Sequence, residues 1–352
     1  MKRILKIIGA VLATSLLVFT GCDIETEDGL AVNRAPGAWT VVDLDDDSIV
    51  INKISYGNGV FVAVGRKGSG SASVSYSGVS SDLVNWTETT DTAAFGTDNM
   101  HGYFGGGSFV ATGASSGNYH WAQSSDGDSW QGMGTSSTNF NAKGGVFGSG
   151  YWLLSGSQGR IAYSANLTAW TTLTGTATTF TNTGPAAYIN SVSYGNEVYV
   201  AGGGSGHIAY AANPTGSWTG AVGPESIFSS TGFVNSIAFG GGRFVAVGGV
   251  DNAVGQAALS ADGQSWTAPP TLPFGTVNTQ MTSVAYGNGG FIAADSLGRA
   301  FYSSNSGVNW SAIANNGFQN DNTPIYGICY SSEKGVWVLA GANGRIAYSF
   351  EN

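Results

Sequence analysis

The chain has 352 residues and a formal net charge of −9, and only 10% of its residues are charged. An acidic chain with so few cations has no evident basic face to neutralise phosphates, which argues against nucleic acid as a partner. It contains two cysteines and 55 glycines, and at this length a chain can bury a sufficient core without disulfides.

The first 21 residues have the pattern of an export signal. Three cations in the first six residues precede the mostly apolar run 7–19, and Thr20-Gly21-Cys22 follows. This run is short for the roughly 20 residues of a membrane-spanning helix, which disfavours an uncleaved anchor. The ending resembles the lipobox of bacterial lipoproteins, with Phe19 where leucine is usual. The resemblance implies a signal peptide over 1–21, a lipid on Cys22 and a lipid-anchored location in the cell envelope, periplasmic or surface-exposed.

Residues 22–36 are predicted to be an acidic, flexible tether between the lipid and the domain, because four carboxylates fall between residues 23 and 28. A second acidic run, Asp45-Asp46-Asp47, offers oxygen ligands for Ca²⁺. The glycine and the closing glutamate of an EF-hand are absent, so a solvated loop is the favoured interpretation. We predict no metal and no other cofactor.

A repeat dominates the rest of the chain. An aromatic-Gly pair recurs six times, and Tyr330-Ser331 is a looser seventh copy. The aromatic markers are spaced 43 to 48 residues apart, at Tyr56, Phe104, Phe147, Tyr194, Phe239, Tyr286 and Tyr330. Around Tyr194, apolar and small polar residues alternate on both sides of a Gly-Asn turn, which is typical of two strands joined by a hairpin. A third strand follows, as in 160–164, and a fourth begins at a tryptophan.

Four strands in about 46 residues match one blade of a β-propeller. A β-sandwich would not keep seven equal repeats, and β-solenoid repeats are usually shorter. No part of the chain after the export signal shows sustained helical periodicity. The sequence therefore predicts an all-β fold, a propeller whose blades are four-stranded and antiparallel.

The tryptophans predict how the ring closes. Six repeats end at a tryptophan, namely Trp86, Trp130, Trp170, Trp218, Trp266 and Trp310. The seventh repeat reaches Tyr348 without one, and the spare Trp39 precedes the first repeat. We therefore expect a seven-bladed propeller over 37–352, with the last blade closed by the N-terminal strand, because an unpaired outer edge would otherwise remain.

The turn before each tryptophan carries a short motif. It reads Ser124-Ser-Asp126-Gly127 before Trp130, and similar turns precede four other tryptophans. This pattern resembles the Asp-box, or BNR repeat, of sialidase-like propellers. A short Asp or Asn side chain accepts backbone N–H groups, a glycine allows positive φ, and the indole packs between sheets. The resemblance implies a structural role for Asp82, Asp126, Asn166, Asp262 and Asn305.

Resemblance to sialidases raises the question of a glycosidase. Those enzymes hold a carboxylate with three arginines and use a tyrosine, a glutamate and an aspartate in catalysis. Here Arg160, Arg299 and Arg345 share one repeat position and would lie around a ring, so a turn-capping role is favoured. The glutamates have no recognisable catalytic setting, and the histidines show no metal-ligand spacing. No catalytic residue is predicted, and a non-enzyme is favoured without the question being decided.

Candidate ligand-binding residues form two groups. The first group comes from the position four residues before each aromatic marker, where most side chains are uncharged and can form hydrogen bonds. From this position we select Asn52, Lys143, Asn190, Asn235 and Tyr326. If they surround the mouth of a central channel, they suit a sugar or a peptide better than an ion. The second group is Tyr119 and Trp121, whose rings suit contact with a sugar or a protein but fit a strand core equally well.

Three functions are consistent with these features. The leading hypothesis is a non-enzymatic cell-envelope lipoprotein whose propeller binds or scaffolds a glycan or protein partner. The first alternative is a glycoside hydrolase or lyase of unfamiliar type. The second rests on a resemblance to BNR-type propellers that act as photosystem assembly factors, which implies a partner in a membrane complex.

Overall fold

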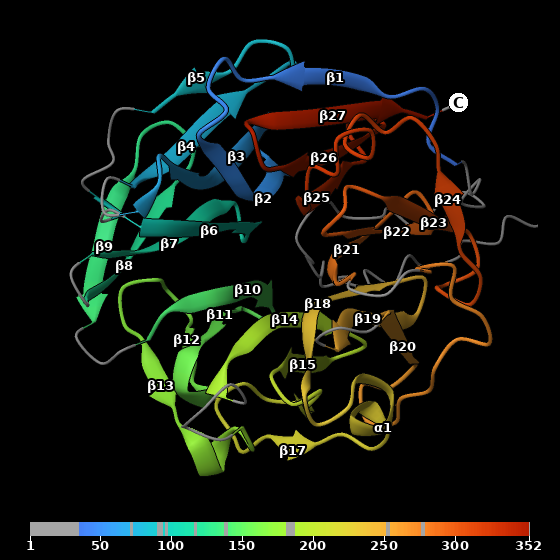
Figure 1. Cartoon of the computed structure of the whole chain (residues 1–352). Coiled ribbons are helices and arrows are strands. Elements are labelled where there is room, and N and C mark those ends of the chain that lie inside the picture. The colour runs from blue at the N-terminus through green and yellow to red at the C-terminus, as the bar shows by residue number, and fades with distance from the viewer. Residues whose placement is uncertain are drawn as a thin grey trace, which may run out of the picture.

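The computed structural model describes residues 35–70, 73–89, 94–95, 98–115, 118–136, 140–180, 187–250, 254–275 and 279–351. Within them, seven small antiparallel sheets form a closed ring (Figure 1). No helix in this part of the chain is long and apolar enough to cross a membrane. Cys22 and the segments predicted as signal and tether up to residue 34 lie outside the described residues, so these assignments stay predictions.

The strands of each blade follow one another outward from the centre of the ring (Figure 1). Blades 1 to 3 contain β2 (Ile49–Gly57), β3 (Val60–Lys67), β4 (Val74–Ser80) and β5 (Thr87–Glu88), then β6 (Asp98–Gly105), β7 (Ser108–Ser115), β8 (Asn118–Ser124) and β9 (Gln131–Ser136), then β10 (Ala142–Gly148), β11 (Tyr151–Gly156), β12 (Ile161–Ser164) and β13 (Thr171–Leu173). Blades 4 to 6 contain β14 (Ile189–Gly195), β15 (Val198–Gly203), β16 (Ile208–Ala211) and β17 (Thr219–Gly220), then β18 (Gly232–Gly240), β19 (Arg243–Val250) and β20 (Gly255–Ser260), then β21 (Met281–Gly287), β22 (Gly290–Asp295), β23 (Ala300–Ser303) and β24 (Ser311–Ile313).

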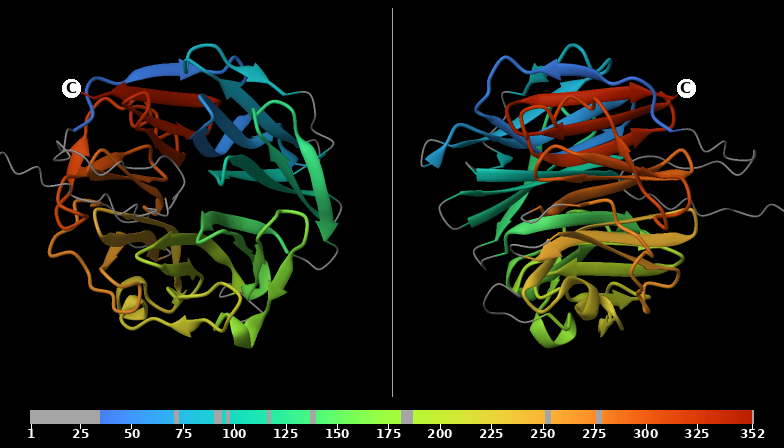
Figure 2. Two further views of the ribbon diagram at one scale, coloured as in Figure 1. Left: turned by 180° about the vertical axis from the view of Figure 1, so that it is seen from behind. Right: turned by 45° about the vertical axis from the view of Figure 1, so that its right-hand side comes forward.

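Blade 7 contains β25 (Ile325–Ser331), β26 (Val336–Gly341), β27 (Arg345–Phe350) and, outermost, β1 (Thr40–Asp43). Strand β1 pairs with β27 in the antiparallel register Thr40 to Tyr348 and Asp43 to Arg345. The blue strand and the red strand lie side by side in Figure 1 and in both views of Figure 2. The predicted fold class, seven blades closed by the N-terminal strand, is confirmed.

Blade 5 differs from the other blades in its outer strand. Only a single bridge, between Leu259 and Thr267, stands where the fourth strand is expected. Pro269 and Pro270 follow one residue later, and because proline has no N–H they end the pairing after this one bridge. The connection from blade 4 into blade 5 carries the one-turn helix α1 (Pro224–Phe228), and short 3₁₀ turns cover 157–159 and 175–177.

The aromatic-Gly pairs form contacts between blades. Within a hairpin, the marker ring packs on the aromatic that opens the second strand, as in Tyr194 and Tyr199, whose ring centroids are 4.4 Å apart. The glycine after the marker receives the marker of the next blade. A Cβ on Gly195 would lie 2.0 Å from Cγ of Phe239, so a larger residue cannot occupy this position without displacing the ring. The repeat therefore encodes the packing of one blade on the next.

The turns before the tryptophans have the hydrogen bonds expected of their sequence. In blade 2, Oδ1 of Asp126 accepts the N–H of Asp128 at 3.0 Å and of Ser129 at 2.8 Å. The indole N–H of Trp130 donates to the carbonyl of Gly127, whose φ is 77°. The same bonds recur around Asp82, Asn166, Asp262 and Asn305. Trp39 and Trp218, which have no complete motif before them, have no hydrogen-bond partner for the indole N–H among the described residues.

A second buried aromatic recurs that the sequence analysis missed. A phenylalanine in the connection between blades is at most 4% exposed in six places, at Phe95, Phe140, Phe180, Phe228, Phe274 and Phe318. Each lies 7 to 14 residues before the next marker. Because this spacing varies, a search at a fixed period does not detect it, although the phenylalanine does recur once per connection.

Candidate functional site

The innermost strands β2, β6, β10, β14, β18, β21 and β25 surround a central cavity of about 100 Å³. Figure 2 shows the ring of blades from behind and in an oblique view. The lining is mostly small or uncharged, and it includes Ser55, Ser191, Ser193, Ser236, Ser283, Ala238 and Ala285. The cavity is smaller than the roughly 300–1,000 Å³ of pockets that enclose a whole drug-sized ligand. It has room for one group of a larger molecule.

The predicted channel residues occupy a β-bulge that recurs in the inner strands. The pairing register shifts between residues 51 and 53, 142 and 144, 189 and 191, 234 and 236, and 325 and 327. Asn52, Lys143, Asn190, Asn235 and Tyr326 are the extra residues at these shifts. A bulge leaves its extra residue outside the ladder and re-aims the side chain. The count of four residues before the marker thus identified one structural position, here called the bulge position.

At three bulge positions the asparagine side chain links neighbouring blades. The amide of Asn52 donates to the carbonyl of Met100 at 3.0 Å, and that of Asn190 to the carbonyl of Val234 at 3.1 Å. Asn235 donates in the same way to Met281 at 2.9 Å. Each bond satisfies a carbonyl on the inner strand of the next blade. These amides hold the ring together, and any role in ligand binding stays a prediction.

Serines one residue after the bulge position also form hydrogen bonds to the next blade. Oγ of Ser191 accepts the N–H of Ile237 at 3.0 Å, and Oγ of Ser236 accepts the N–H of Val284 at 3.2 Å. Both serines lie one residue after the bulge position. The equivalent residues in blades 1 and 2 are Lys53 and His101, so there the repeat replaces a small linking side chain with a basic one.

Lys53, His101 and Lys143 form a basic cluster contributed by three consecutive blades. Burial lowers the pKa of Lys53 to about 8 and also lowers the pKa of Lys143. Burial, together with the positive charges of both lysines, lowers the pKa of His101 to about 3. Nδ1 of His101 is buried without a hydrogen-bond partner in the described part of the chain. His101 is therefore near enough to both lysines for their positive charges to disfavour its protonation, although the chain as a whole is acidic.

Lys143, which lines the cavity, is also held by two tyrosines. Its Nζ lies 4.4 Å from the centroid of the Tyr188 ring, a cation–π contact. The hydroxyl of Tyr103 donates to the carbonyl of Lys143 and so fixes the bulge from the neighbouring blade. Lys143 was predicted from the sequence, whereas Lys53 and His101 were not, because the prediction rested on a single position per repeat. A comparison of the next position in each repeat, which is basic at Lys53 and His101, would have predicted the cluster.

The second predicted group lies elsewhere. Trp121 is on β8, the third strand from the centre of blade 2, and its ring packs on Trp170 with centroids 6.0 Å apart. Its indole N–H has no hydrogen-bond partner among the residues that the structure describes. The side chain of Tyr119 lies outside the description. The structure therefore does not bring Trp121 to the bulge positions, and its part in binding stays a prediction.

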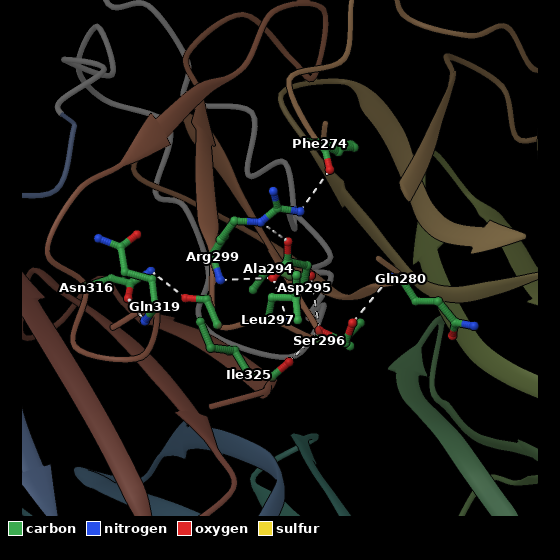
Figure 3. Close-up of polar contacts among 12 residues, drawn as sticks. Phe274, Gln280, Ala294, Asp295, Ser296, Leu297, Arg299, Asn316, Gln319 and Ile325 are labelled. Carbon is green, nitrogen blue, oxygen red and sulfur yellow. Dashed lines mark hydrogen bonds and ion pairs between the residues drawn. The ribbon is translucent and has the colours of Figure 1, made fainter. Parts of the chain in front are cut away.

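Two of the arginines at the start of third strands, Arg299 and Arg345, tie their blades to the connections before them. Figure 3 shows Arg299, whose Nε donates to Oδ2 of the fully buried Asp295 at 2.6 Å and whose Nη2 donates to the carbonyl of Phe274 at 2.9 Å. The other carboxylate oxygen of Asp295 accepts the N–H of Leu297 and of Arg299, each at 2.9 Å. This network fixes the hairpin between β22 and β23.

Arg345 does the same at the closure of the ring. It contacts Asp43 of β1 at 2.8 Å and Asp321 at 2.7 Å. Neither Arg299 nor Arg345 lines the central cavity. The turn-capping interpretation of these arginines agrees with their contacts, and they do not converge on one pocket.

The acidic run between β1 and β2 and the histidines do not form a metal site in the described residues, where no three of His, Cys, Asp and Glu are grouped as ligands. Oδ1 of Asp46 accepts the N–H of Ser48 at 2.9 Å, and Lys67 lies 3.4 Å from its other oxygen. His207 contacts Glu225 at 3.0 Å. Asp46 and His207 thus each have a local partner.

No protein-family model matches the sequence, and a search of curated proteins finds no match. Solved structures do match the fold. YCF48 bound to a D1 peptide gives a TM-score of 0.63 at 13% identity, over 90% of this chain and 98% of that one. Virginiamycin B lyase from Staphylococcus aureus, as a catalytically inactive variant with quinupristin, gives 0.69 at 12%, over 89% and 99%. The Pan2 WD40 domain of Neurospora crassa gives 0.59 at 12%, over 89% and 96%. At such identities the likeness shows the propeller fold alone.

Proposed function

We propose that this protein is a non-enzymatic binding or scaffolding module of the cell envelope, held to a membrane by a lipid on Cys22. Its partner, a protein or a glycan, docks at the end of the channel that carries the bulges. The basic cluster of Lys53, His101 and Lys143 carries this proposal. The asparagine and serine side chains at these positions link neighbouring blades, whereas the three basic side chains break the repeat. Lys53 and Lys143 line one cavity at an energetic cost, and His101 lies near both.

A protein partner is favoured over a glycan. A propeller of the same fold, YCF48, has been solved with a D1 peptide bound, and a cavity of about 100 Å³ receives part of a chain more readily than a whole saccharide. The resemblance to assembly factors points to a partner in a membrane complex. A lipid anchor would concentrate the propeller on the membrane that holds such a partner.

We infer further that the turns before the tryptophans are copies of the Asp-box. Their carboxylates and amides accept backbone N–H groups of their own turn. In this role the Asp and Asn side chains of the turns stabilise the blades and are not available for catalysis. Kinship with sialidase-like propellers would therefore carry the scaffold without the activity.

Capture from detergent extracts of the cell envelope tests the proposal. The full-length lipidated protein is immobilised, and a partner should be retained by it and by a Tyr119→Ala/Trp121→Ala variant if the channel end is the docking site. Loss of the partner only in that variant would move the site to the edge of blade 2. Turnover of a glycan panel by the wild type, abolished by substitutions at the bulge positions, would favour the hydrolase or lyase alternative instead.

A further inference from the structure

The basic cluster has no carboxylate to balance it within the described residues. The lining of the central cavity contains two lysines and no aspartate or glutamate. Some cations elsewhere in the described residues do have such partners: Lys67 lies 2.9 Å from Glu88, and Arg299 lies 2.6 Å from Asp295. Burying charge without a partner is costly. The cluster thus differs from these ion-paired cations, because its cavity offers its lysines no carboxylate.

The cluster also has the geometry of a receptor for a small anion. Lys53 and Lys143 line one cavity from β2 and β10, and His101 on the intervening β6 feels both of their charges. Tyr188 and Tyr103 hold the segment around Lys143 in place. Nδ1 of His101 is buried and unpartnered in the described part of the chain. Cations fixed in a partly desolvated site favour an oxyanion, which accepts charge-assisted hydrogen bonds from several donors at once.

We propose that the channel section between Lys53, His101 and Lys143 receives a carboxylate group of a partner polypeptide. This inference rests on the proposed binding function and specifies the chemistry of its ligand. The size of the cavity admits a carboxylate with part of the chain behind it, either the C-terminus or an acidic side chain. The seven inner strands supply a narrow, mostly uncharged wall, so an extended chain end enters along the channel while the rest of the partner remains outside.

Peptide libraries on the full-length protein test this inference. Random hexapeptides are prepared in three forms: with free C-termini, as C-terminal amides lacking Asp and Glu, and as amides containing one Asp or Glu. We expect retention of the free acids, of the acidic amides, or of both, and the pattern identifies the source of the carboxylate. Equal retention of the neutral amides, or preferential retention of an oligogalacturonate, would overturn the inference.

Variants connect the retention to the cluster. Lys53→Met/Lys143→Met should reduce retention of carboxylate peptides by about tenfold or more, which corresponds to about 1.4 kcal/mol. Lys53→Arg/Lys143→Arg keeps both charges and should retain them. Lys334→Met is the matched control, because Lys334 lies in the β25–β26 hairpin at the opposite end of the inner strands, 5.8 Å from the Tyr56 ring. Unchanged retention in the double methionine variant would contradict the inference, provided that its melting curve shows a folded protein.

The two levels of the proposal fail separately. If the double methionine variant still captures the envelope partner and no carboxylate preference exists, the binding function stands and the carboxylate inference is wrong. If the wild type captures no envelope partner, the binding function fails whatever the peptides show.

Discussion

At the scale of single residues, glycines of the aromatic-Gly pairs act as seats for the next blade. Gly195→Ala would place a Cβ 2.0 Å from Cγ of Phe239. We expect a loss of about 1–3 kcal/mol in the free energy of unfolding, the usual cost of overpacking. Urea denaturation measures it. Gly132→Ala is the control, because a Cβ there would have only one neighbour, the Cα of Ala94 at 4.0 Å. Equal effects of the two substitutions would contradict the role of Gly195.

Lys53 makes a second residue-scale prediction, with the opposite sign. Burial lowers its pKa to about 8, so between that value and about 10.4 the unfolded chain binds more protons and stability rises with pH. Lys53→Met removes a cation that folding disfavours below pH 8. We expect a higher melting temperature than wild type at pH 7 and a smaller difference near pH 10.

The matching control is Lys67→Met. Glu88 raises the pKa of Lys67 through a hydrogen bond and its charge, although burial acts against it. Because this cation gains from folding, its removal should leave the melting temperature unchanged or lower it. A gain in both variants would mean that methionine stabilises through its apolar surface alone, irrespective of charge.

At the scale of elements, the turns before the tryptophans make stability depend on acid pH. The N–H of Asn85 lowers the pKa of Asp82, and the N–H of Ser265 lowers the pKa of Asp262. The pKa of Asp126 is lowered too, where burial acts against the N–H groups of Ser129 and Asp128. A carboxylate with a depressed folded pKa stabilises above its unfolded pKa of about 3.9 and loses this effect as pH falls through the folded value.

Replacement of these three aspartates with asparagine tests the turn chemistry. Asn166 and Asn305 already perform the same role in blades 3 and 6, where Oδ1 accepts N–H groups at 3.0 and 2.8 Å. We expect the triple variant to melt near the wild-type temperature at pH 7 and to lose less stability between pH 4 and pH 2. A matching triple alanine variant should be destabilised at both ends of the range, because the acceptor is gone.

At the scale of the whole molecule, stability depends on a strand from the far end of the chain. Deletion of residues 37–42 removes most of β1, exposes the edge of β27 and separates Arg345 from its partner strand. We expect a large loss of melting temperature, measured by circular dichroism. A synthetic peptide of residues 37–44, added in excess, should restore part of the loss by mass action. An unchanged melt of the deletion variant would contradict closure by this strand.

The sequence by itself determined the architecture, because a propeller repeats the same packing problem once per blade. The aromatic marker, its glycine and the tryptophan make the local packing contacts of each blade, and they recur in the sequence at a nearly regular spacing. Even the count that did not balance, Trp39 against the missing tryptophan after Tyr348, predicted the strand pair that closes blade 7. The bulge position was also detectable in the sequence, because residues 52, 143, 190, 235 and 326 each lie four residues before an aromatic marker.

Only the tertiary structure decided which of these positions are engaged within the protein. In the sequence, Asn52, Asn190 and Asn235 have the pattern of a ring of ligand-binding residues. In the structure, each side-chain amide instead donates a hydrogen bond to a carbonyl of the next blade, about 46 residues along the chain. Lys53 and Lys143 are 90 residues apart in sequence, and closure of the ring places them on one cavity. Repetition makes local packing legible in a sequence. Which side chains of different blades meet at the central cavity depends on the angle at which each blade approaches the axis. The sequence of a single repeat does not contain this information.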